Sequence, residues 1–144
     1  MATVHRASPH LPTVLVLAGH DPTGGAGLVA DAEAVAACGS WAVTVPTALT
    51  VQSCRDVRRV VPSDPDLMRA AAEALDEFEI AAIKVGLVAD LATLDAITDI
   101  VRRFPGVPLV VDPVLKAGGG RELSTVELVD GFRERLLPLV DILT

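Results

Sequence analysis

Short apolar runs alternate along this chain with longer stretches in which apolar and polar residues mix. Runs with the length of β-strands cover residues 13–18, 41–46, 81–85, 109–112 and 142–144. Between them, residues 26–38, 65–78, 91–104 and 124–136 have the amphipathic spacing of helices. Strands that alternate with such helices form parallel sheets, because each helix returns the chain across one face of the sheet. We therefore expect an α/β fold with an open, mostly parallel sheet flanked by helices.

Several residues carry signals for helix ends. Gly39 follows the first expected helix, where a residue with positive φ is favoured. Ser63 is a candidate N-cap two residues before Pro65, which is tolerated in a first turn. Ser124 is followed three residues later by Glu127, which is the spacing of a capping box. These signals support the predicted helix boundaries.

A glycine-rich loop follows the first apolar run, with Gly19, Gly24, Gly25 and Gly27 in nine residues. Glycines in a strand-to-helix turn let the backbone approach a ligand closely, although a tight turn without a ligand is the alternative. The loop lacks the lysine of a P-loop. A Rossmann spacing fits from Gly25 to Ala30, but residues 40–50 contain no acid to bind a ribose. Both observations argue against these two nucleotide sites.

Composition excludes some classes of partner. The net charge of −7 gives no broad basic field, which argues against nucleic acid and anionic membrane surfaces. Cys38 and Cys54 form no disulfide framework, and the first apolar run leads into a polar loop instead of a signal-peptide cleavage site. We expect a cytoplasmic protein with an N-terminal extension at residues 1–12. Residues 13–144 are expected to form part of a single domain.

Four segments in order carry a family resemblance: residues 19–31, 47–52, 83–87 and 111–115. They read Gly-His-Asp-Pro-Thr-Gly-Gly-Ala-Gly-Leu-Val-Ala-Asp, Thr-Ala-Leu-Thr-Val-Gln, Ile-Lys-Val-Gly-Leu and Val-Asp-Pro-Val-Leu. With these segments the chain resembles the hydroxymethylpyrimidine and phosphomethylpyrimidine kinases of thiamine synthesis, which have a ribokinase-like fold. The resemblance covers about the first half of a family member.

The resemblance implies ATP-dependent phosphorylation of 4-amino-5-hydroxymethyl-2-methylpyrimidine and its monophosphate, with ATP and Mg²⁺ as cofactors. The family's Gly-Thr-Gly-Cys loop, with its catalytic cysteine, does not occur in this sequence. Neither Cys38 nor Cys54 matches it, so we assign no catalytic residue. The chain is expected to supply the pyrimidine-binding half and to be weakly active or inactive alone.

The candidate substrate-binding residues all follow expected strands, and ligands of open sheets bind at the carboxyl ends of strands. Gln52 offers both a donor and an acceptor, which suits a ring nitrogen beside an exocyclic amine. Asp31 can accept hydrogen bonds from an aminopyrimidine, or it is a solvated acid. The resemblance implies substrate-binding roles for these two residues and for four others, which would form backbone walls or apolar ring contacts: Gly19, Ala26, Leu87 and Val114. Leu87 and Val114 are alternatively ordinary core residues.

Two charged residues lie in or at the end of apolar strands. Asp112 is costly to bury without a partner, so we expect a phosphate-bound Mg²⁺ or a backbone donor beside it. Lys84 is expected to form a structural ion pair rather than to meet a phosphate. After Asp112, the glycines at 118–120 suggest either a flap over phosphates or a flexible surface turn.

Some alternatives to the pyrimidine kinase remain open. His20 and the Ser53-Cys54 pair depart from the family pattern, so a pyridoxal-type vitamin kinase stays a candidate within the enzyme hypothesis. A non-catalytic pyrimidine-binding module is the candidate from another class. A third is a structural subunit that pairs with another chain, for example as a homodimer, through an open sheet edge at residues 142–144.

Overall fold

The computed structural model describes residues 11–114 and 124–144. The strands are β1 (Thr13–His20), β2 (Trp41–Gln52), β3 (Val57–Pro62), β4 (Ile80–Val85), β5 (Leu109–Val111) and β6 (Ile142–Leu143). The helices are α1 (Gly27–Ala37), α2 (Pro65–Glu73), α3 (Leu91–Arg102) and α4 (Val126–Arg135), followed by the 3-10 turn η1 (Leu137–Leu139). Most of the expected N-terminal extension and the glycines at 118–120 lie outside the described residues. Within the described ranges, no helix combines the length and the apolar character that crossing a membrane requires.

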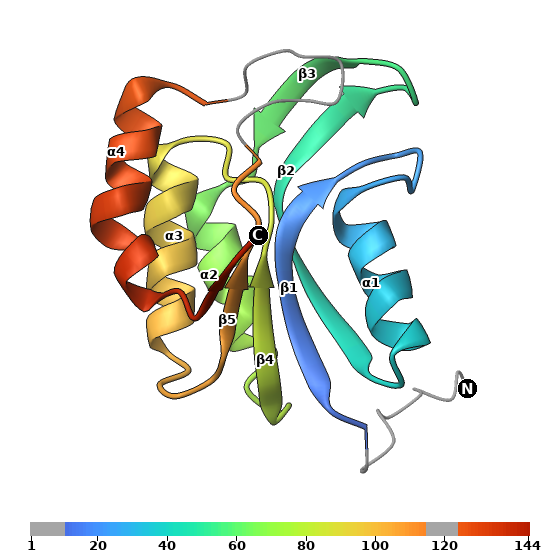
Figure 1. Cartoon of the computed structure of the whole chain (residues 1–144), viewed down its shortest axis with the longest axis vertical. Helices are drawn as coiled ribbons and strands as arrows, with labels where there is room; N and C mark the ends of the chain where they lie inside the picture. Colours follow the sequence, from blue (N-terminus) through green and yellow to red (C-terminus); the bar gives the residue numbers. More distant parts are fainter. Residues whose placement is uncertain (1–10, 115–123) are drawn as a thin grey trace.

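A single six-stranded sheet organises the chain, with the order β3-β2-β1-β4-β5-β6 (Figure 1). Every neighbouring pair is parallel except β2 and β3, which pair antiparallel as a hairpin at one edge. The expectation of an open, mostly parallel sheet is confirmed.

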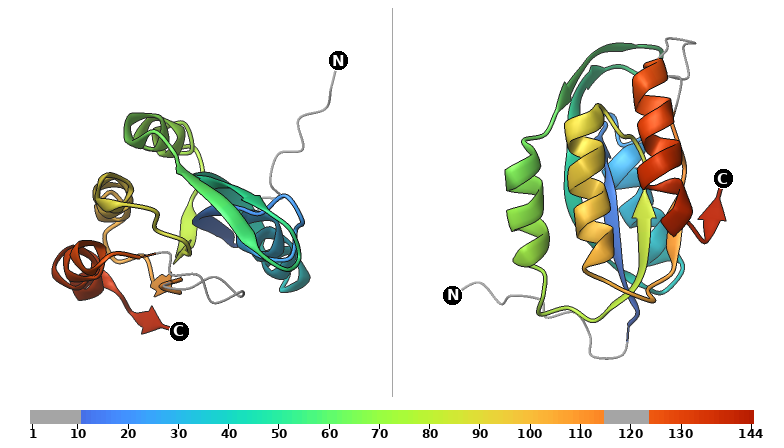
Figure 2. Two further views of the ribbon diagram at one scale, coloured as in Figure 1. Left: turned by 90° about the horizontal axis from the view of Figure 1, so that it is seen from above. Right: turned by 90° about the vertical axis from the view of Figure 1, so that its left-hand side faces the viewer.

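Helices cover both faces of the sheet. Helix α1 contacts β1 and β2 on one face, whereas α2, α3 and α4 form a row on the other (Figure 2). Leu15 and Leu17 of β1 pack into the large core with α2 and α3, and both are fully buried. Val16 points to the opposite face and is fully buried as well. β1 is therefore buried on both sides, which explains its unbroken apolar sequence.

The N-cap residues of α2 and α4 each lie one position later than the sequence signals indicated. The side chain of Asp64, not Ser63, accepts a hydrogen bond of 2.8 Å from the backbone N–H of Leu67 at the start of α2. Thr125, not Ser124, is the N-cap of α4, and its side chain accepts a hydrogen bond from the backbone N–H of Leu128. Both expectations were wrong because each helix is preceded by two adjacent residues that are able to act as N-cap. The path of the backbone into the first turn decides which of the two side chains reaches the N–H groups there. The end of α1 follows the expectation, since Gly39 has a φ of 75°.

The hairpin of β2 and β3 was missed by the sequence analysis. β2 continues to Gln52, beyond the expected end at residue 46. β3 alternates poorly, because Arg58 and Arg59 stand side by side between valines. Pairing between β1 and β2 shifts by one residue at Ala18/Gly19, which leaves Thr47 as an extra residue in β2. Strand β2 is therefore longer than its apolar segment and changes register near its middle.

β6 forms the other edge of the described sheet. It pairs with β5, and its residues Ile142 and Leu143 are each more than half exposed. The pairing of a second chain at this edge stays a prediction.

Candidate functional site

The turn between β1 and α1 is held by short local contacts. The side chain of Asp21, which is only 5% exposed, accepts hydrogen bonds from the backbone N–H of Thr23 at 2.7 Å and from its hydroxyl at 3.0 Å. At the start of the helix, Gly27 has a φ of 62°, and a Cβ built there would lie 2.1 Å from the carbonyl oxygen of Gly19. The backbone at the helix start thus approaches the end of β1 more closely than any side chain would permit.

Two threonine hydroxyls join β2 to the neighbouring loops. The hydroxyl of Thr47, a fully buried residue, donates to the carbonyl of Leu87 in the loop after β4. The hydroxyl of Thr50 donates to the carbonyl of His20 at 2.9 Å. The far end of β2 is therefore tied to the loop that follows β4 and, through His20 at the end of β1, to the start of the loop that follows β1.

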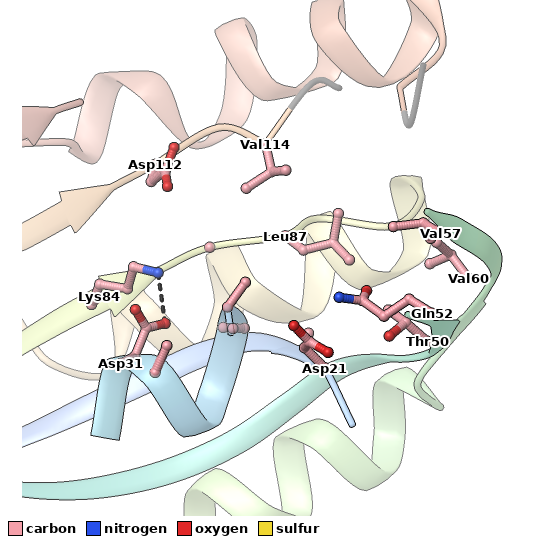
Figure 3. Close-up of a pocket in the computed structure, with 16 residues that line it drawn as sticks. Asp21, Asp31, Thr50, Gln52, Val57, Val60, Lys84, Leu87, Asp112 and Val114 are labelled. Atoms are coloured by element: carbon pink, nitrogen blue, oxygen red, sulfur yellow. Dashed lines mark hydrogen bonds and ion pairs between the residues drawn. The ribbon is translucent and has the colours of Figure 1, made fainter. Parts of the chain in front are cut away.

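These loops surround a cavity of about 310 Å³ at the carboxyl ends of the strands (Figure 3). Its size is at the lower end of the range for small-molecule sites, and its lining is mostly apolar with a few polar groups, as such sites require. All of the site residues expected from the sequence line this one cavity: Gly19, Ala26, Asp31, Gln52, Leu87, Asp112 and Val114. The structure brings them together, and their individual roles stay predictions.

An ion pair forms one wall of the cavity. The amine Nζ of Lys84 on β4 lies 2.6 Å from the carboxylate oxygen Oδ2 of Asp31 on α1. Both side chains are largely buried, with 24% and 22% of their area exposed. The expectation of an ion pair for Lys84 is confirmed, and Asp31 is not a freely solvated acid.

The β2–β3 hairpin forms the opposite wall. Thr50 and Gln52 line the cavity from β2, and Val57 and Val60 line it from β3. The amide of Gln52 points into the cavity (Figure 3) and has no hydrogen bond to another residue within the described part of the chain. Its donor and its acceptor are therefore both available to a ligand.

Gly19 and Leu87 form an apolar part of the lining. A Cβ at Gly19 would lie 2.9 Å from Cδ2 of Leu87, so a side chain at this position would displace Leu87. Val114 lines the cavity from the segment after β5 and is half-buried. This part of the lining offers a smooth apolar surface to a planar ring.

The argument from burial for Asp112 was wrong. β5 ends at Val111, and Asp112 beyond it is exposed, so its charge needs no partner to offset burial. Among residues 11–114 and 124–144, no group of three or more histidine, cysteine or acidic side chains could hold a metal ion. A single carboxylate fits Mg²⁺ only where phosphate oxygens and water supply the other ligands.

Several lining residues were not expected from the sequence. Asp21, Thr50 and Gly86 lie within the quoted motifs, whereas Val57 and Val60 belong to the missed strand β3. The motif at residues 47–52 contained a signal for Thr50, because it alternates with Gln52 on the same face of a strand.

In the comparison with protein families, the family model of phosphomethylpyrimidine kinase matches residues 21–144. The hydroxymethylpyrimidine/phosphomethylpyrimidine kinase of Escherichia coli is 34% identical over 131 residues, which are 90% of this chain and 49% of that protein. The chloroplastic thiamine biosynthetic bifunctional enzyme TH1 of Arabidopsis thaliana is 36% identical over 93% of this chain and 26% of its own length. The chain spans about half the length of these relatives, or less.

Solved structures agree with the sequence comparison. A crystal structure of phosphomethylpyrimidine kinase from Clostridium difficile superimposes with a TM-score of 0.83 at 29% identity, covering 92% of this chain and 58% of that chain. An ADP complex of Bacillus subtilis pyridoxal kinase has a TM-score of 0.79 at 23% identity, covering 92% of this chain and 49% of that chain. The second likeness shows the fold alone.

Proposed function

Because the chain belongs to the phosphomethylpyrimidine kinase family, we propose that its cavity binds a 4-amino-5-hydroxymethylpyrimidine or its monophosphate as the acceptor of a phosphoryl group. The observation that carries this proposal is the presence of Gln52 and Asp31 on facing walls of one small cavity. An aminopyrimidine carries donors and acceptors next to each other on a planar ring, and these two side chains offer the complementary groups.

Each part of the lining has a role in this proposal. The carbonyl of Gln52 accepts a hydrogen bond from the exocyclic amine, and its NH₂ donates to the adjacent ring nitrogen. Asp31 accepts a second hydrogen bond from the amine. Leu87 and Val114 contact the faces of the ring, while Gly19 and Ala26 bring backbone close to its edge.

The proposed reaction transfers the γ-phosphoryl group of ATP in line to the hydroxymethyl oxygen of the ring. A P–O bond forms to this oxygen, the bond between the γ-phosphorus and the bridging oxygen breaks, ADP leaves, and the hydroxyl proton is released. Positioning and neutralisation of charge dominate the rate of such transfers. We propose Asp112 as one ligand of a Mg²⁺ held mainly by phosphates.

Two exposed free thiols, Cys38 and Cys54, support our inference of a reducing, cytoplasmic setting.

Calorimetric titration of 4-amino-5-hydroxymethyl-2-methylpyrimidine into the chain tests the proposal. We expect saturable binding that weakens about tenfold or more in Gln52→Ala, because two hydrogen bonds of about 0.5–1.5 kcal/mol each are lost. Val51→Ala is the matched control, since Val51 is the neighbouring residue of β2, is 52% exposed and does not line the cavity.

The outcomes separate the candidate functions. Equal binding by wild type and Gln52→Ala, or no binding by a folded wild type, would contradict the proposed site. Tighter binding of pyridoxal than of the pyrimidine would favour the pyridoxal-type kinase. Binding of the pyrimidine without phosphorylation fits both the binding half of a kinase and a binding module, whereas phosphorylation in the presence of MgATP would exclude the binding module.

A further inference from the structure

In the ion pair between Lys84 and Asp31, the amine contacts only one of the two carboxylate oxygens. It connects β4 to α1 across β1, because Lys84 pairs in register with Val16 of β1 and α1 packs on β1 and β2. The amine reaches only Oδ2 of the carboxylate, at 2.6 Å. Within the described residues the ion pair with Lys84 uses Oδ2 alone, and no buried side-chain oxygen or nitrogen lacks a partner, so the carboxylate of Asp31 stays open to solvent or a ligand.

From this geometry we propose that Lys84 is a positioning residue that selects for an amino group on the bound ring. By holding Oδ2 at 2.6 Å, Lys84 fixes the rotamer of Asp31 and thus the direction in which its carboxylate accepts hydrogen bonds at the cavity. An N–H donor on the ligand gains from this oriented carboxylate, whereas a ring without such a donor gains nothing from it. The proposal rests on the function proposed above, because it takes the ligand to be an aminopyrimidine.

The surroundings of the amine support the proposal. A Cβ at Gly86 would lie 3.0 Å from Nζ of Lys84 and 3.1 Å from Cβ of Ala18. Side chains two residues apart on a strand share a face, so Nζ occupies the space that a side chain at position 86 would take. The missing side chain of Gly86 thus leaves room for Lys84 to fold toward Asp31, and both Gly86 and Ala18 line the cavity as well.

If the ion pair had only a structural role, mutation of Lys84 would have different effects on binding. A structural pair stabilises the fold whether or not a ligand is bound, so its loss would weaken binding of any ligand to a similar extent. Arg135 and Asp95 form a pair of the same length, 2.6 Å, between α4 and α3 on the opposite face of the sheet. Arg135→Met therefore removes the same charge and a pair of the same length without touching the cavity, which makes it the control for Lys84→Met.

The test measures binding of two ligands by calorimetry and unfolding by heat in the full chain. The ligands are 4-amino-5-hydroxymethyl-2-methylpyrimidine and the same ring without its amino group. For Lys84→Met we expect about tenfold weaker binding of the amino compound and less than twofold change for the deamino compound. Arg135→Met, whose pair is more exposed at 42% and 48%, should lower Tm without changing the ratio of the two affinities.

Further variants keep the test valid if Lys84→Met folds poorly. Gly86→Ala keeps the lysine but displaces its amine, and should weaken binding of the amino compound more than that of the deamino compound, since its methyl group also lies at the cavity. Lys84→Arg should retain most of the selectivity, since it keeps a cation within reach of Oδ2. Combined with Asp31→Asn, Lys84→Met should add less than a twofold loss, because Asp31 is the group through which it acts.

The results distinguish this proposal from the proposed function. If Lys84→Met binds both ligands as the wild type does, or weakens both equally, Lys84 does not position Asp31, while pyrimidine binding still stands. Tighter binding of the amino compound by Lys84→Met also overturns the inference, because the lysine would then compete with the ligand. If the wild type binds neither compound, both the proposed function and the role of Lys84 are refuted.

Discussion

The close approach of Gly27 to Gly19 leads to a quantitative prediction for Gly27→Ala. The φ of 62° at Gly27 is unfavourable for alanine by about 1–2 kcal/mol. The added Cβ would also lie 2.1 Å from the carbonyl oxygen of Gly19, far inside van der Waals contact, and the atom it meets is backbone. Relief of such overlap costs about 1–3 kcal/mol more. The total of about 2–5 kcal/mol is a large part of the 5–15 kcal/mol that stabilises a typical domain.

Gly39→Ala is the matched control for this variant. Gly39 has a similar φ of 75°, but a Cβ there would meet nothing within 4 Å. It should therefore lose only the conformational part, about 1–2 kcal/mol. The effect of alanine on the unfolded chain is common to both variants, so their difference isolates the contact with Gly19.

Urea unfolding followed by circular dichroism measures both variants. With an m value of about 2 kcal/mol/M, Gly27→Ala should lower the midpoint by roughly 1–2.5 M, and Gly39→Ala by about 0.5–1 M. Equal losses in the two variants would refute the reasoning, because the contact at 2.1 Å would then have no energetic consequence.

Three further predictions concern local interactions. Asp90→Ala removes a capping box in which the Asp90 carboxylate accepts from the backbone N–H of Thr93 at 2.8 Å, and should cost about 1 kcal/mol in urea unfolding, whereas Asp90→Asn should stay near wild type. Thr47→Val leaves the carbonyl of Leu87 without its donor and should cost about 1–3 kcal/mol; if Thr47→Ser, which keeps the hydroxyl, loses as much, the hydrogen bond is not the cause. The pKa of Glu127 is lowered, first by a hydrogen bond from its own backbone N–H and then by one from the Thr125 hydroxyl. The ionised carboxylate therefore stabilises the fold at pH values above its pKa in the unfolded chain, and this contribution is lost as pH falls through its pKa in the folded protein. Melting curves should show Glu127→Gln less stable than wild type near neutral pH and equal to it in acid; a constant difference would contradict this.

The central part of the fold could be predicted because burial and sequence pattern agree there. β1 and β4 lie in the middle of the sheet, and their apolar runs predicted them directly. β3 could not be predicted in the same way, because it is an edge strand with one exposed face and adjacent arginines. The hairpin is held by pairing with β2, which local sequence does not reveal.

The candidate site shows the same division. The motifs predicted that Gln52 and Asp31 lie near each other at the carboxyl ends of the strands, because each follows an expected strand of one parallel sheet. Sequence alone suggested an ion pair for Lys84 but did not identify Asp31 as its partner, since the contact joins residues 53 positions apart. The expected burial of Asp112 failed because β5 ends one residue earlier than its apolar pattern suggested.

The register shift in β2 shows how readily the chemistry of this cavity can change. Beyond Thr47, even-numbered residues such as Thr50 and Gln52 line the cavity, while Leu49 and Val51 are exposed on the other face. Side chains alternate along a strand, so deletion of one residue at the bulge would turn the two hydrophobic residues inward and the two polar residues outward. Deletion of the single residue Thr47 would thereby change this wall of the cavity from polar to hydrophobic without any substitution. The identity of the side chains on this wall of the cavity is therefore set by the number of residues in β2 as much as by their type.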